Sequence, residues 1–333
     1  TKTFAETLRT EYDATTGENL GALIEGSSTN LCTHSETMGS TGWATGNQDT
    51  ILQNVKKAPD DTITMASITS GATIGSSYMR KNIVLTAGVT YTVSVYASSN
   101  DTFTTGNVVK VVSPNNGVLG ELSLVAAQLT DKVKRYSLTF QVLTSQTHYF
   151  YFAVDADANK TIEVWGAQLE ALPFASSYIR TEGSAVSRSS DNLNLPVTSI
   201  PAPSKKQSMI VNFSAQSQGI NDRVYEIGGT GNGRRHMFLT STNIGYRYQN
   251  VVNFTAPLVA NTPYNTVSSF DGTSVKFYVD ENLIFSSTVA DQTDTSTAFK
   301  IGADINGLAT FYGHISKLST YAQALTAQEI TLL

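Results

Sequence analysis

The residues of this chain that could do chemistry are tyrosines with polar neighbours on strand-like segments. In "IGYRYQN", Tyr246, Tyr248 and Asn250 lie on one face, because successive side chains of a strand point to opposite sides. Pyranose rings stack on exposed aromatic faces, and nearby amide groups bind their hydroxyls. This segment is the first candidate for a carbohydrate-binding surface.

A second tyrosine face comes from the segment "HYFYFAV". Phe150 and Phe152 share one face of the predicted strand, while Tyr149 and Tyr151 share the other. We expect the phenylalanine face to lie in a core. The tyrosine face either forms another platform for a sugar ring or packs under a loop, and the sequence leaves both interpretations open.

The glycine-densest stretch is "GGTGNGRRH", residues 228–236. It lacks the Lys-Ser/Thr pair of a phosphate-binding loop, and it joins two predicted strands instead of opening a helix. A flexible hairpin is therefore expected. As a functional loop it would present Arg234, Arg235 and His236 to an acidic saccharide, because guanidinium groups pair well with carboxylates.

A calcium site is the one metal centre that the sequence suggests. "DADANK" places Asp155, Asp157 and Asn159 at alternate positions, as at the start of a calcium-binding loop. Lys160 stands where such a loop has glycine, and Gly166 stands where it has a bidentate glutamate. A structural calcium ion is thus the only cofactor considered, and a polar turn between two strands is the alternative interpretation.

Catalytic groups are missing at the spacing that hydrolysis needs. A glycosidase requires two carboxylates about 5 to 9.5 Å apart on opposite sides of the bond. Glu11 and Asp13 form the one Glu-x-Asp pattern, and threonines follow where another glutamate would be needed. Glu163 and Glu170 point to opposite faces of their predicted strand. We therefore expect a protein that is not an enzyme.

Composition limits both the fold and the partners. Charged residues make up 15% of the chain, the net charge is −5 and no basic run occurs, which argues against nucleic acid as a partner. No apolar stretch approaches the roughly 20 residues that cross a bilayer, so we expect no membrane insertion. Abundant Ser, Thr, Asn and Gly favour an all-β fold. A single cysteine, Cys32, leaves stability to core packing or oligomerisation.

The strand pattern predicts two antiparallel β-sandwiches of jelly-roll type in tandem. Alternating segments such as "VTYTVSVYASS" fill residues 37–172, which are expected to form the first sandwich. Another strand series fills residues 208–333 and forms the second. Residues 1–36 are expected to be a short extended or hairpin segment of their own. Thr326 and Glu329 predict a capping box, and with it one short C-terminal helical turn.

Residues 173–207 are expected to form an ordered linker between the sandwiches. Prolines and many serines mark the segment as a connection. Pro173 ends the preceding strand, since proline has no N–H to donate. Phe174, Tyr178 and Ile179 are too apolar for a free linker, so we expect this stretch to pack along a domain surface.

Several phrases of the sequence together resemble a known family of modules. "YDATTGENLGALIEGSSTNL", "GWATGN" and "YTVSVYA" resemble the opening of a recurrent module in tail and virion proteins of tailed bacteriophages, and "WGAQLEALPFASSYIRTEGSAVSRSSD" resembles its closing segment. In the C-terminal half, "FDGTSVKFYVDENLIFSS" and "FYGHISKLSTYAQALTAQEI" are similar to concanavalin A-like, laminin-G-type jelly rolls. The resemblance implies a carbohydrate-binding-module-like first sandwich and a laminin-G-like second one.

The same resemblance implies a non-enzymatic tail fibre or receptor-binding protein that attaches a virion to host surface polysaccharide. It further implies other virion proteins as partners, a homotrimer, a place on the exterior of the tail or capsid, and synthesis in the host cytoplasm. The alternative is a structural virion protein, such as a capsid decoration, collar or fibre-shaft element, which contacts only other virion proteins. A polysaccharide depolymerase is disfavoured by the missing carboxylate pair.

Overall fold

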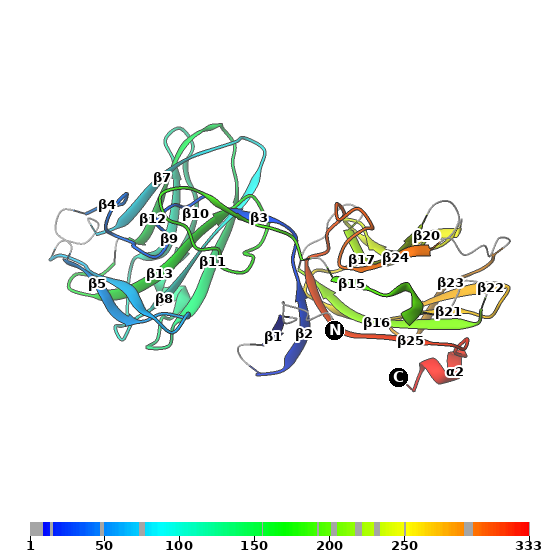
Figure 1. The fold of residues 1–333 in the computed structure, drawn as a ribbon. Helices are drawn as coiled ribbons and strands as arrows, with labels where there is room; N and C mark the ends of the chain where they lie inside the picture. Colours follow the sequence, from blue (N-terminus) through cyan, green and yellow to red (C-terminus); the bar gives the residue numbers. More distant parts are fainter. Residues whose placement is uncertain are drawn as a thin grey trace. The chain divides into compact units, whose positions relative to one another are not determined.

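The chain forms two compact units in the computed structural model (Figure 1). The central unit comprises Ser27–Arg188, and the terminal unit comprises Thr1–Gly26 together with Ser189–Leu333. The structure describes residues 9–13, 16–46, 50–72, 77–154, 156–191, 193–200, 205–216, 222–229, 234–249, 251–289 and 296–332. Within these ranges, no helix has the length and apolar character needed to span a membrane.

The central unit contains two five-stranded antiparallel sheets. The first, which we call the β12 sheet, has the order β10-β9-β12-β7-β4, with bounds β4 Ala44–Thr45, β7 Met79–Leu85, β9 Asn107–Ser113, β10 Gly117–Ser123 and β12 Gln146–Val154. The second, the β13 sheet, has the order β11-β8-β13-β6-β5, with bounds β5 Thr50–Lys57, β6 Ile63–Thr69, β8 Thr90–Ser98, β11 Lys134–Gln141 and β13 Thr161–Glu170. The pair β3 (Ser28–Asn30) with β14 (Val186–Arg188) and one helical turn, α1 (Leu124–Ala127), complete the unit.

Side-chain alternation decides which face of each central sheet is core. Phe150 and Phe152 of β12 are 1% and 0% exposed, and Phe140 of β11 lies against Phe150 with ring centroids 6.0 Å apart. Val93 and Val95 of β8 reach the same core. The two sheets therefore pack face to face as a sandwich. The phenylalanine face of β12 is core, as predicted, and its tyrosine face points away from that core.

The terminal unit is a second sandwich of two antiparallel sheets. The seven-stranded β16 sheet has the order β1-β2-β25-β16-β21-β22-β23, with bounds β1 Thr10–Tyr12, β2 Asn19–Ile24, β16 Gln207–Ala215, β21 Pro263–Phe270, β22 Ser274–Val279, β23 Asn282–Thr288 and β25 Gly313–Tyr321. The six-stranded β17 sheet has the order β15-β24-β17-β18-β19-β20, with bounds β15 Leu193–Leu195, β17 Asp222–Gly229, β18 Arg235–Leu239, β19 Asn243–Tyr248, β20 Val251–Pro257 and β24 Ser296–Ile301. A 3-10 turn, η1 (Val197–Ser199), follows β15. The predicted all-β fold with two antiparallel sandwiches is confirmed.

The N-terminal strands complete the β16 sheet of the terminal unit. β2 pairs with β25, and Ile24 is buried in the core at 2% exposure. Gly21 has a left-handed backbone (φ 99°), and a Cβ there would come within 2.5 Å of the Ile315 carbonyl, so glycine permits the close approach of the two strands. The partner strand lies at the other end of the sequence, and no local pattern reveals it.

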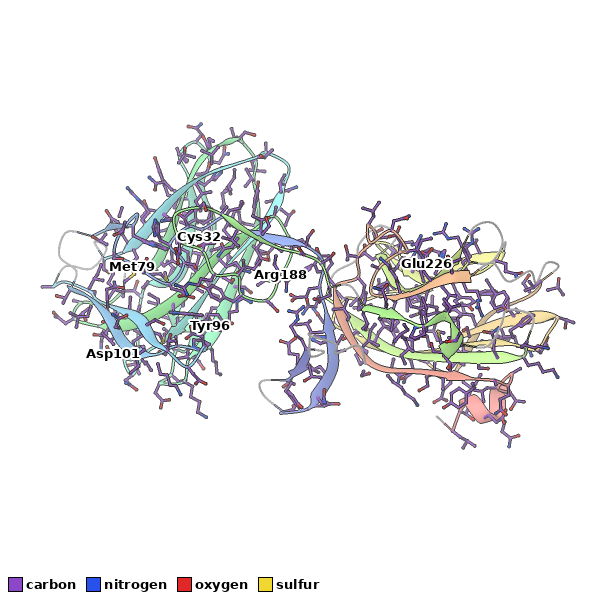
Figure 2. The ribbon with its side chains drawn as sticks, in the orientation of Figure 1. Cys32, Met79, Tyr96, Asp101, Arg188 and Glu226 are labelled. Atoms are coloured by element: carbon purple, nitrogen blue, oxygen red, sulfur yellow. The ribbon has the colours of Figure 1, made fainter. Side chains whose placement is uncertain are left out.

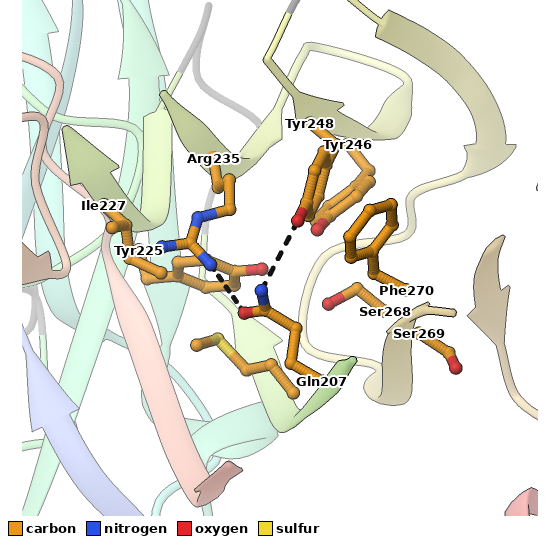
Figure 3. Close-up of a pocket in the computed structure, with 10 residues that line it drawn as sticks. Gln207, Tyr225, Ile227, Arg235, Tyr246, Tyr248, Ser268, Ser269 and Phe270 are labelled. Atoms are coloured by element: carbon orange, nitrogen blue, oxygen red, sulfur yellow. Dashed lines mark hydrogen bonds between the residues drawn. The ribbon is translucent and has the colours of Figure 1, made fainter. Parts of the chain in front are cut away.

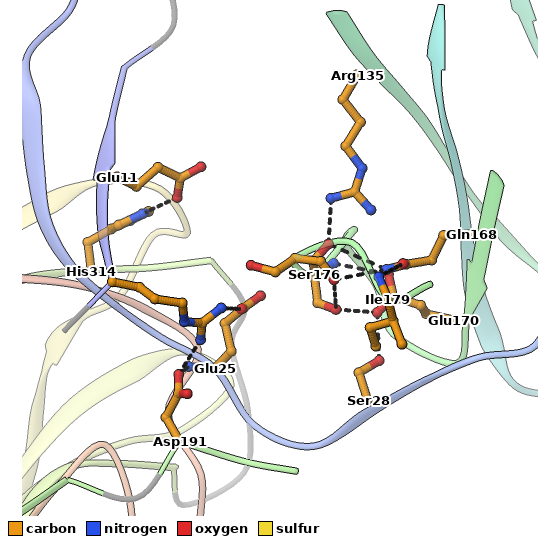
Figure 4. Close-up of polar contacts among 12 residues, drawn as sticks. Glu11, Glu25, Ser28, Arg135, Gln168, Glu170, Ser176, Ile179, Asp191 and His314 are labelled. Carbon is orange, nitrogen blue, oxygen red and sulfur yellow. Dashed lines mark hydrogen bonds and ion pairs between the residues drawn. The ribbon is translucent and has the colours of Figure 1, made fainter. Parts of the chain in front are cut away.

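The predicted segments 1–36 and 173–207 are each divided between the units. The described residues up to Gly26 join the β16 sheet, whereas β3 pairs with β14 in the central unit. Near the second boundary, Arg9 donates to Glu25 at 2.6 Å and to Asp191 at 2.5 Å, which ties both chain segments into the terminal unit (Figure 4). The unit boundaries at 26/27 and 188/189 thus differ from those that composition suggested.

The C-terminal helical turn has the capping box that the sequence predicts. In α2 (Ala327–Ile330), the Thr326 hydroxyl accepts from the Glu329 N–H, and the Glu329 carboxylate accepts from the Thr326 N–H at 2.8 Å. Ile330 is 3% exposed and joins a small apolar cluster beneath β16, β21 and β22. The prediction of a short terminal helix is confirmed, and the cap satisfies backbone groups that the helix itself leaves unpaired.

The segment that follows β13 docks on the central unit through buried polar groups (Figure 4). Glu170 is fully buried and accepts hydrogen bonds from the Ser28 hydroxyl at 2.6 Å and the Ser176 N–H at 3.0 Å. Gln168, which is also fully buried, accepts from the Ile179 N–H at 2.7 Å. The segment therefore packs along the surface of the central unit, as its apolar residues predict.

Glu170→Ala should loosen this docking, because Ser28 and Ser176 lose a buried acceptor at a cost of about 1–3 kcal/mol. Cys32, labelled in Figure 2, reports the loss: it is 1% exposed, and burial raises the pKa of its thiol to about 12. The thiol therefore reacts with a thiol reagent only when the central unit opens. The labelling rate should rise roughly 5- to 150-fold over that of the unsubstituted chain, in proportion to the open population.

Glu182→Ala is the matched control for this experiment. The Glu182 side chain is 81% exposed and belongs to the same segment. Its removal should leave the Cys32 labelling rate unchanged. Equal rates for Glu170→Ala and the unsubstituted chain would contradict the docking.

Candidate functional site

Tyr246 and Tyr248 lie inside the terminal unit (Figure 3). Each is 2% exposed; Tyr246 stacks on Phe277 with centroids 4.7 Å apart, and Tyr248 stacks on Phe270 at 4.9 Å. The two tyrosines do share a face, but that face is the core. This corrects the expectation of a sugar platform, because both rings are buried between the two sheets and stack on phenylalanines there. Asn250, the third predicted member, lies outside the described residues.

Arg235 is also a core residue, which corrects its assignment to a binding loop. It is 2% exposed, and its Nη1 donates to Gln207 Oε1 at 2.5 Å (Figure 3). Gln207 in turn donates to the Tyr248 hydroxyl at 3.4 Å. The free volume among these side chains is about 10 Å³, of the order of what a single water molecule needs. A saccharide does not fit there.

Arg234 and His236 lie on the outer side of the β17 sheet, around Glu226 (labelled in Figure 2). Arg234 donates to Glu226 Oε1 from Nε at 2.9 Å and from Nη2 at 2.7 Å. The ring of His236 is 3% exposed, and burial and three neighbouring arginines lower its pKa to about 2. These arginines are Arg223, Arg234 and Arg247. The structure thus brings two of the three predicted basic residues together and adds partners that the sequence reasoning missed.

The suggested calcium ligands are only partly described. Asp155 lies outside the described residues, while Asp157 accepts from the Thr104 N–H at 2.5 Å and from the Thr104 hydroxyl at 2.7 Å. These bonds hold the pKa of the Asp157 carboxyl below its usual value. Asn159 has a left-handed backbone (φ 57°), and its N–H donates to the Ser70 carbonyl at 3.1 Å, as in a turn. In the described ranges, no three His, Cys, Asp or Glu residues gather to hold a metal ion. The calcium site stays a prediction.

The outer face of the β12 sheet carries the strongest candidate site. Tyr149 and Tyr151 are half-buried on this face. On the neighbouring strand β7, Asn82 lies opposite Tyr149 and Arg80 lies opposite Tyr151. Tyr78, just before β7, meets the Tyr151 ring edge-on, with centroids 5.4 Å apart. We call this group the Arg80 surface: Tyr78, Arg80, Asn82, Tyr149 and Tyr151.

Arg80 is held by aromatic rings and has no carboxylate partner among the described residues. Its guanidinium carbon lies 5.6, 5.3 and 5.8 Å from the centres of the three tyrosine rings, close enough for cation–π attraction. Its Nε is buried and has no hydrogen-bond partner within the described ranges. A guanidinium fixed in this way, with unused donors, can bind hydroxyl or carboxylate oxygens of a ligand.

A hollow of about 450 Å³ adjoins the Arg80 surface and shares Arg80 and Asn82 with it. This volume falls in the range of about 300–1,000 Å³ that small-molecule sites have. Lys81 donates to the Gly42 carbonyl at 2.7 Å and lies 4.9 Å from the ring centre of Trp43. The Trp43 indole N–H donates to the His34 carbonyl at 3.1 Å. The walls of the hollow are thus tied together by hydrogen bonds and a cation–π contact.

The sequence held a signal for this site in "YMRKN", where Tyr78, Arg80 and Asn82 occupy alternate positions. Alternation alone does not show which strand lies beside it, and the pairing of β7 with β12 supplies that information. Trp43 packs on Phe152, with centroids 5.5 Å apart, and it also forms a wall of the hollow.

The carboxylates considered for hydrolysis lie apart from this site. Glu11 contacts His314, with Oε2 and Nε2 2.6 Å apart, in the terminal unit (Figure 4). Glu163 accepts from the Ser98 hydroxyl at 3.0 Å, and Glu170 is buried under the docked segment. None of them belongs to the Arg80 surface or lines the hollow. The arrangement suits binding through stacking and hydrogen bonds.

Comparison with known proteins agrees with the fold. Residues 199–331 match the family model of the concanavalin A-like lectin/glucanases superfamily, of the laminin G type. This part of the chain is therefore similar to concanavalin A-like domains of the laminin G type. A comparison with curated proteins finds no match.

The similar solved structures include a CBM40, a domain of an arabinanase and a pentraxin. The CBM40 of Ruminococcus gnavus IT-sialidase bound to α2,3-sialyllactose is 14% identical, with 38% of this chain and 82% of that chain covered and a TM-score of 0.34. Domain 4 of AbnA, a GH43 extracellular arabinanase from Geobacillus stearothermophilus in complex with arabinotriose, is 18% identical, with 43% and 71% covered and a TM-score of 0.35. The SAP-like pentraxin of Limulus polyphemus is 12% identical, with 38% and 68% covered and a TM-score of 0.32. The three TM-scores are below 0.5, so these likenesses carry no conclusion about this chain.

The depressed pKa of His236 gives a pH prediction for the terminal unit. An unfolded histidine has a pKa of about 6.5, whereas burial holds that of His236 at about 2 in the folded unit. The stability that this neutral ring contributes is therefore fully present above the unfolded pKa and is lost as the pH falls toward the folded pKa. Its ring signals in NMR should not titrate between about pH 7 and pH 4. The same signals in urea-unfolded protein are the control, and a midpoint near pH 6 in the folded protein would contradict the burial.

Proposed function

We propose that this protein binds glycans and that the Arg80 surface of the central unit is the contact site. The observation that carries the proposal is the fixed guanidinium of Arg80 among three tyrosine rings, beside a hollow of about 450 Å³. A sugar ring offers apolar C–H faces to aromatic rings and hydroxyl oxygens to fixed donors. The Arg80 surface meets both requirements on one open sheet face.

The residues of the Arg80 surface offer a glycan two kinds of contact, ring stacking and hydrogen bonds. Tyr149 and Tyr151 supply ring faces for stacking, and Arg80 supplies N–H donors beside them. Asn82, opposite Tyr149, adds an amide that both donates and accepts. Strand pairing and cation–π contacts fix these groups before a ligand arrives, so little side-chain entropy is lost on binding.

The wider role within this proposal is attachment to host surface polysaccharide as part of a tail fibre or receptor-binding protein. Its support is the resemblance of the opening and closing phrases of the sequence to modules of tailed-bacteriophage proteins. A homotrimer on the virion exterior would multiply weak sites, because linked sites raise avidity by about 10² to 10⁴. A structural virion protein is the second candidate, favoured by the low charge of the chain. In that case, a glycan array would show no binding at any concentration.

Arg80→Ala and Tyr151→Ala should each weaken binding of the best glycan from such an array. Losing charge-assisted hydrogen bonds costs about 1.5–3 kcal/mol and losing an aromatic contact costs about 0.5–1.5 kcal/mol, so Kd should rise roughly 10- to 150-fold for the first and 2- to 10-fold for the second. Isothermal titration calorimetry measures both. Tyr151→Phe keeps the ring and should stay within about threefold of the unsubstituted chain.

Arg180→Ala is the matched control, since the Arg180 side chain belongs to the central unit and is 66% exposed. It should bind with unchanged Kd. Cys32 labelling checks that each variant keeps a closed central unit. Unchanged affinity in both Arg80→Ala and Tyr151→Ala would place the glycan elsewhere and contradict the proposed site.

A further inference from the structure

A row of polar and charged side chains crosses the outer face of the β17 sheet. Strand register places Lys300 of β24 opposite Glu226 of β17, and Glu226 opposite His236 of β18. His236 is in turn opposite Arg247 of β19. Residues directly opposite one another in antiparallel strands share a face and lie side by side. We call this row and the two arginines beside it the Glu226 cluster: Arg223, Glu226, Arg234, His236, Arg247 and Lys300.

Two arginines already occupy the carboxylate of this cluster. Glu226 is 0% exposed, and its Oε1 accepts from Arg234 at 2.9 and 2.7 Å. Its Oε2 accepts from Nε of Arg223 at 3.2 Å. A buried carboxylate requires such partners. Both carboxylate oxygens of Glu226 are therefore bound by these two arginines, and among the described residues the remaining cations of the cluster form no ion pair with it.

Arg247 and Lys300 are those remaining cations. Arg247 donates from Nε to the Gln249 carbonyl at 2.6 Å, and neither Arg247 nor Lys300 forms an ion pair with a described residue. Burial and repulsion from Arg234 lower the pKa of Arg247. The cluster thus holds four cations and one carboxylate. Among the described residues, the terminal nitrogens of Arg247 have no hydrogen-bond partner, so these donors can bind a ligand.

His236 adds an unpaired polar atom to the same place. It is 3% exposed, and its Nδ1 lies 3.9 Å from Glu226 Oε2 and has no hydrogen-bond partner in the described part of the chain. The His236 ring packs against the Phe238 ring, with centroids 5.4 Å apart. The guanidinium of Arg223 lies over the same Phe238 ring, 5.3 Å from its centre. A buried polar atom without a partner is uncommon in proteins, and here it lies close to three arginines, Arg223, Arg234 and Arg247.

We propose that the Glu226 cluster binds an oxyanion group, a carboxylate or a sulfate, carried by an acidic saccharide. The planar fork of Arg247 can offer two parallel N–H donors to such a group, which is the geometry that favours carboxylate and sulfate oxygens. Lys300 at the other end of the row adds charge without a fixed direction. The sequence analysis expected an acidic saccharide at Arg234, Arg235 and His236. The proposed site keeps Arg234 and His236, adds Arg247 and omits Arg235, which lies in the core.

The test titrates the full chain with methyl glucuronide, with glucose 6-sulfate and, as the neutral match, with methyl glucoside. The readout is the Nε–Hε signal of Arg247 in NMR, assigned by its loss in Arg247→Ala. A saturable shift with either acidic sugar and none with the glucoside supports the proposal, and the two acidic arms tell carboxylate from sulfate. No shift with either acidic sugar, or equal shifts with the glucoside, overturns it.

Substitutions locate the acidic sugar on the cluster. Arg247→Ala should weaken its binding by about tenfold or more, as loss of a charge-assisted fork predicts. Arg247→Lys keeps the charge and protects the fold, and it should still lose most of the affinity because it lacks the fork. Equal affinity in both variants and the unsubstituted chain would overturn the proposal.

Arg80→Ala separates this proposal from the glycan site of the central unit. It removes the guanidinium of the Arg80 surface, so the Arg247 signal should respond to the acidic sugar as before. Loss of that response in Arg80→Ala would show that the sugar binds elsewhere and would overturn the cluster as the site. The proposal for the Glu226 cluster does not rest on glycan binding by the central unit, because neutral glycans and the Tyr151 variants test that function.

Discussion

Both sandwiches depend on the two-residue alternation of their strands, which gives each sheet one face for the core and one for the outside. The same short pattern, Tyr-x-Tyr, therefore lies on the outer face of a sheet in one unit and in the core of the other. Tyr149 and Tyr151 alternate with core phenylalanines and stay on the outer face. Tyr246 and Tyr248 are themselves the core residues, and Arg247 between them is on the outer face. Which face meets the opposite sheet decides what a pattern can do.

Arginine side chains gather on the outer faces of both units, apart from Arg235, which lies in the core. A charged group taken out of water needs partners, and the two units solve this differently. Arg80 is stabilised by tyrosine rings, which attract the cation without consuming its hydrogen-bond donors. In the Glu226 cluster, a single buried carboxylate holds Arg223 and Arg234, and Arg247 is left over. In both places a fixed guanidinium keeps N–H donors that have no partner among the described residues, and such donors can bind oxygens of a ligand.

Much of the fold could be predicted from the sequence because its determinants are local. The period of two gave the strands, and Thr326 with Glu329 gave the terminal helix, since a capping box acts within one turn. The placement of β2 could not be predicted, because it pairs with β25 at the other end of the chain. Only part of the candidate site could be predicted, because local alternation does not show which strands are neighbours. Tyr149 and Tyr151 follow from parity, whereas Arg80 becomes a neighbour only through the register of β7 with β12.

The central claim is that a glycan lies on the tyrosine face of the β12 sheet. The most direct measurement is NMR of the protein with a bound neutral glycan, observing contacts between sugar ring protons and assigned tyrosine rings. The account predicts contacts to Tyr149 and Tyr151, which flank Arg80, and none to the buried rings of Tyr246 and Tyr248. Sugar contacts confined to the terminal unit, with the rings of Tyr149 and Tyr151 unaffected at saturation, would contradict it.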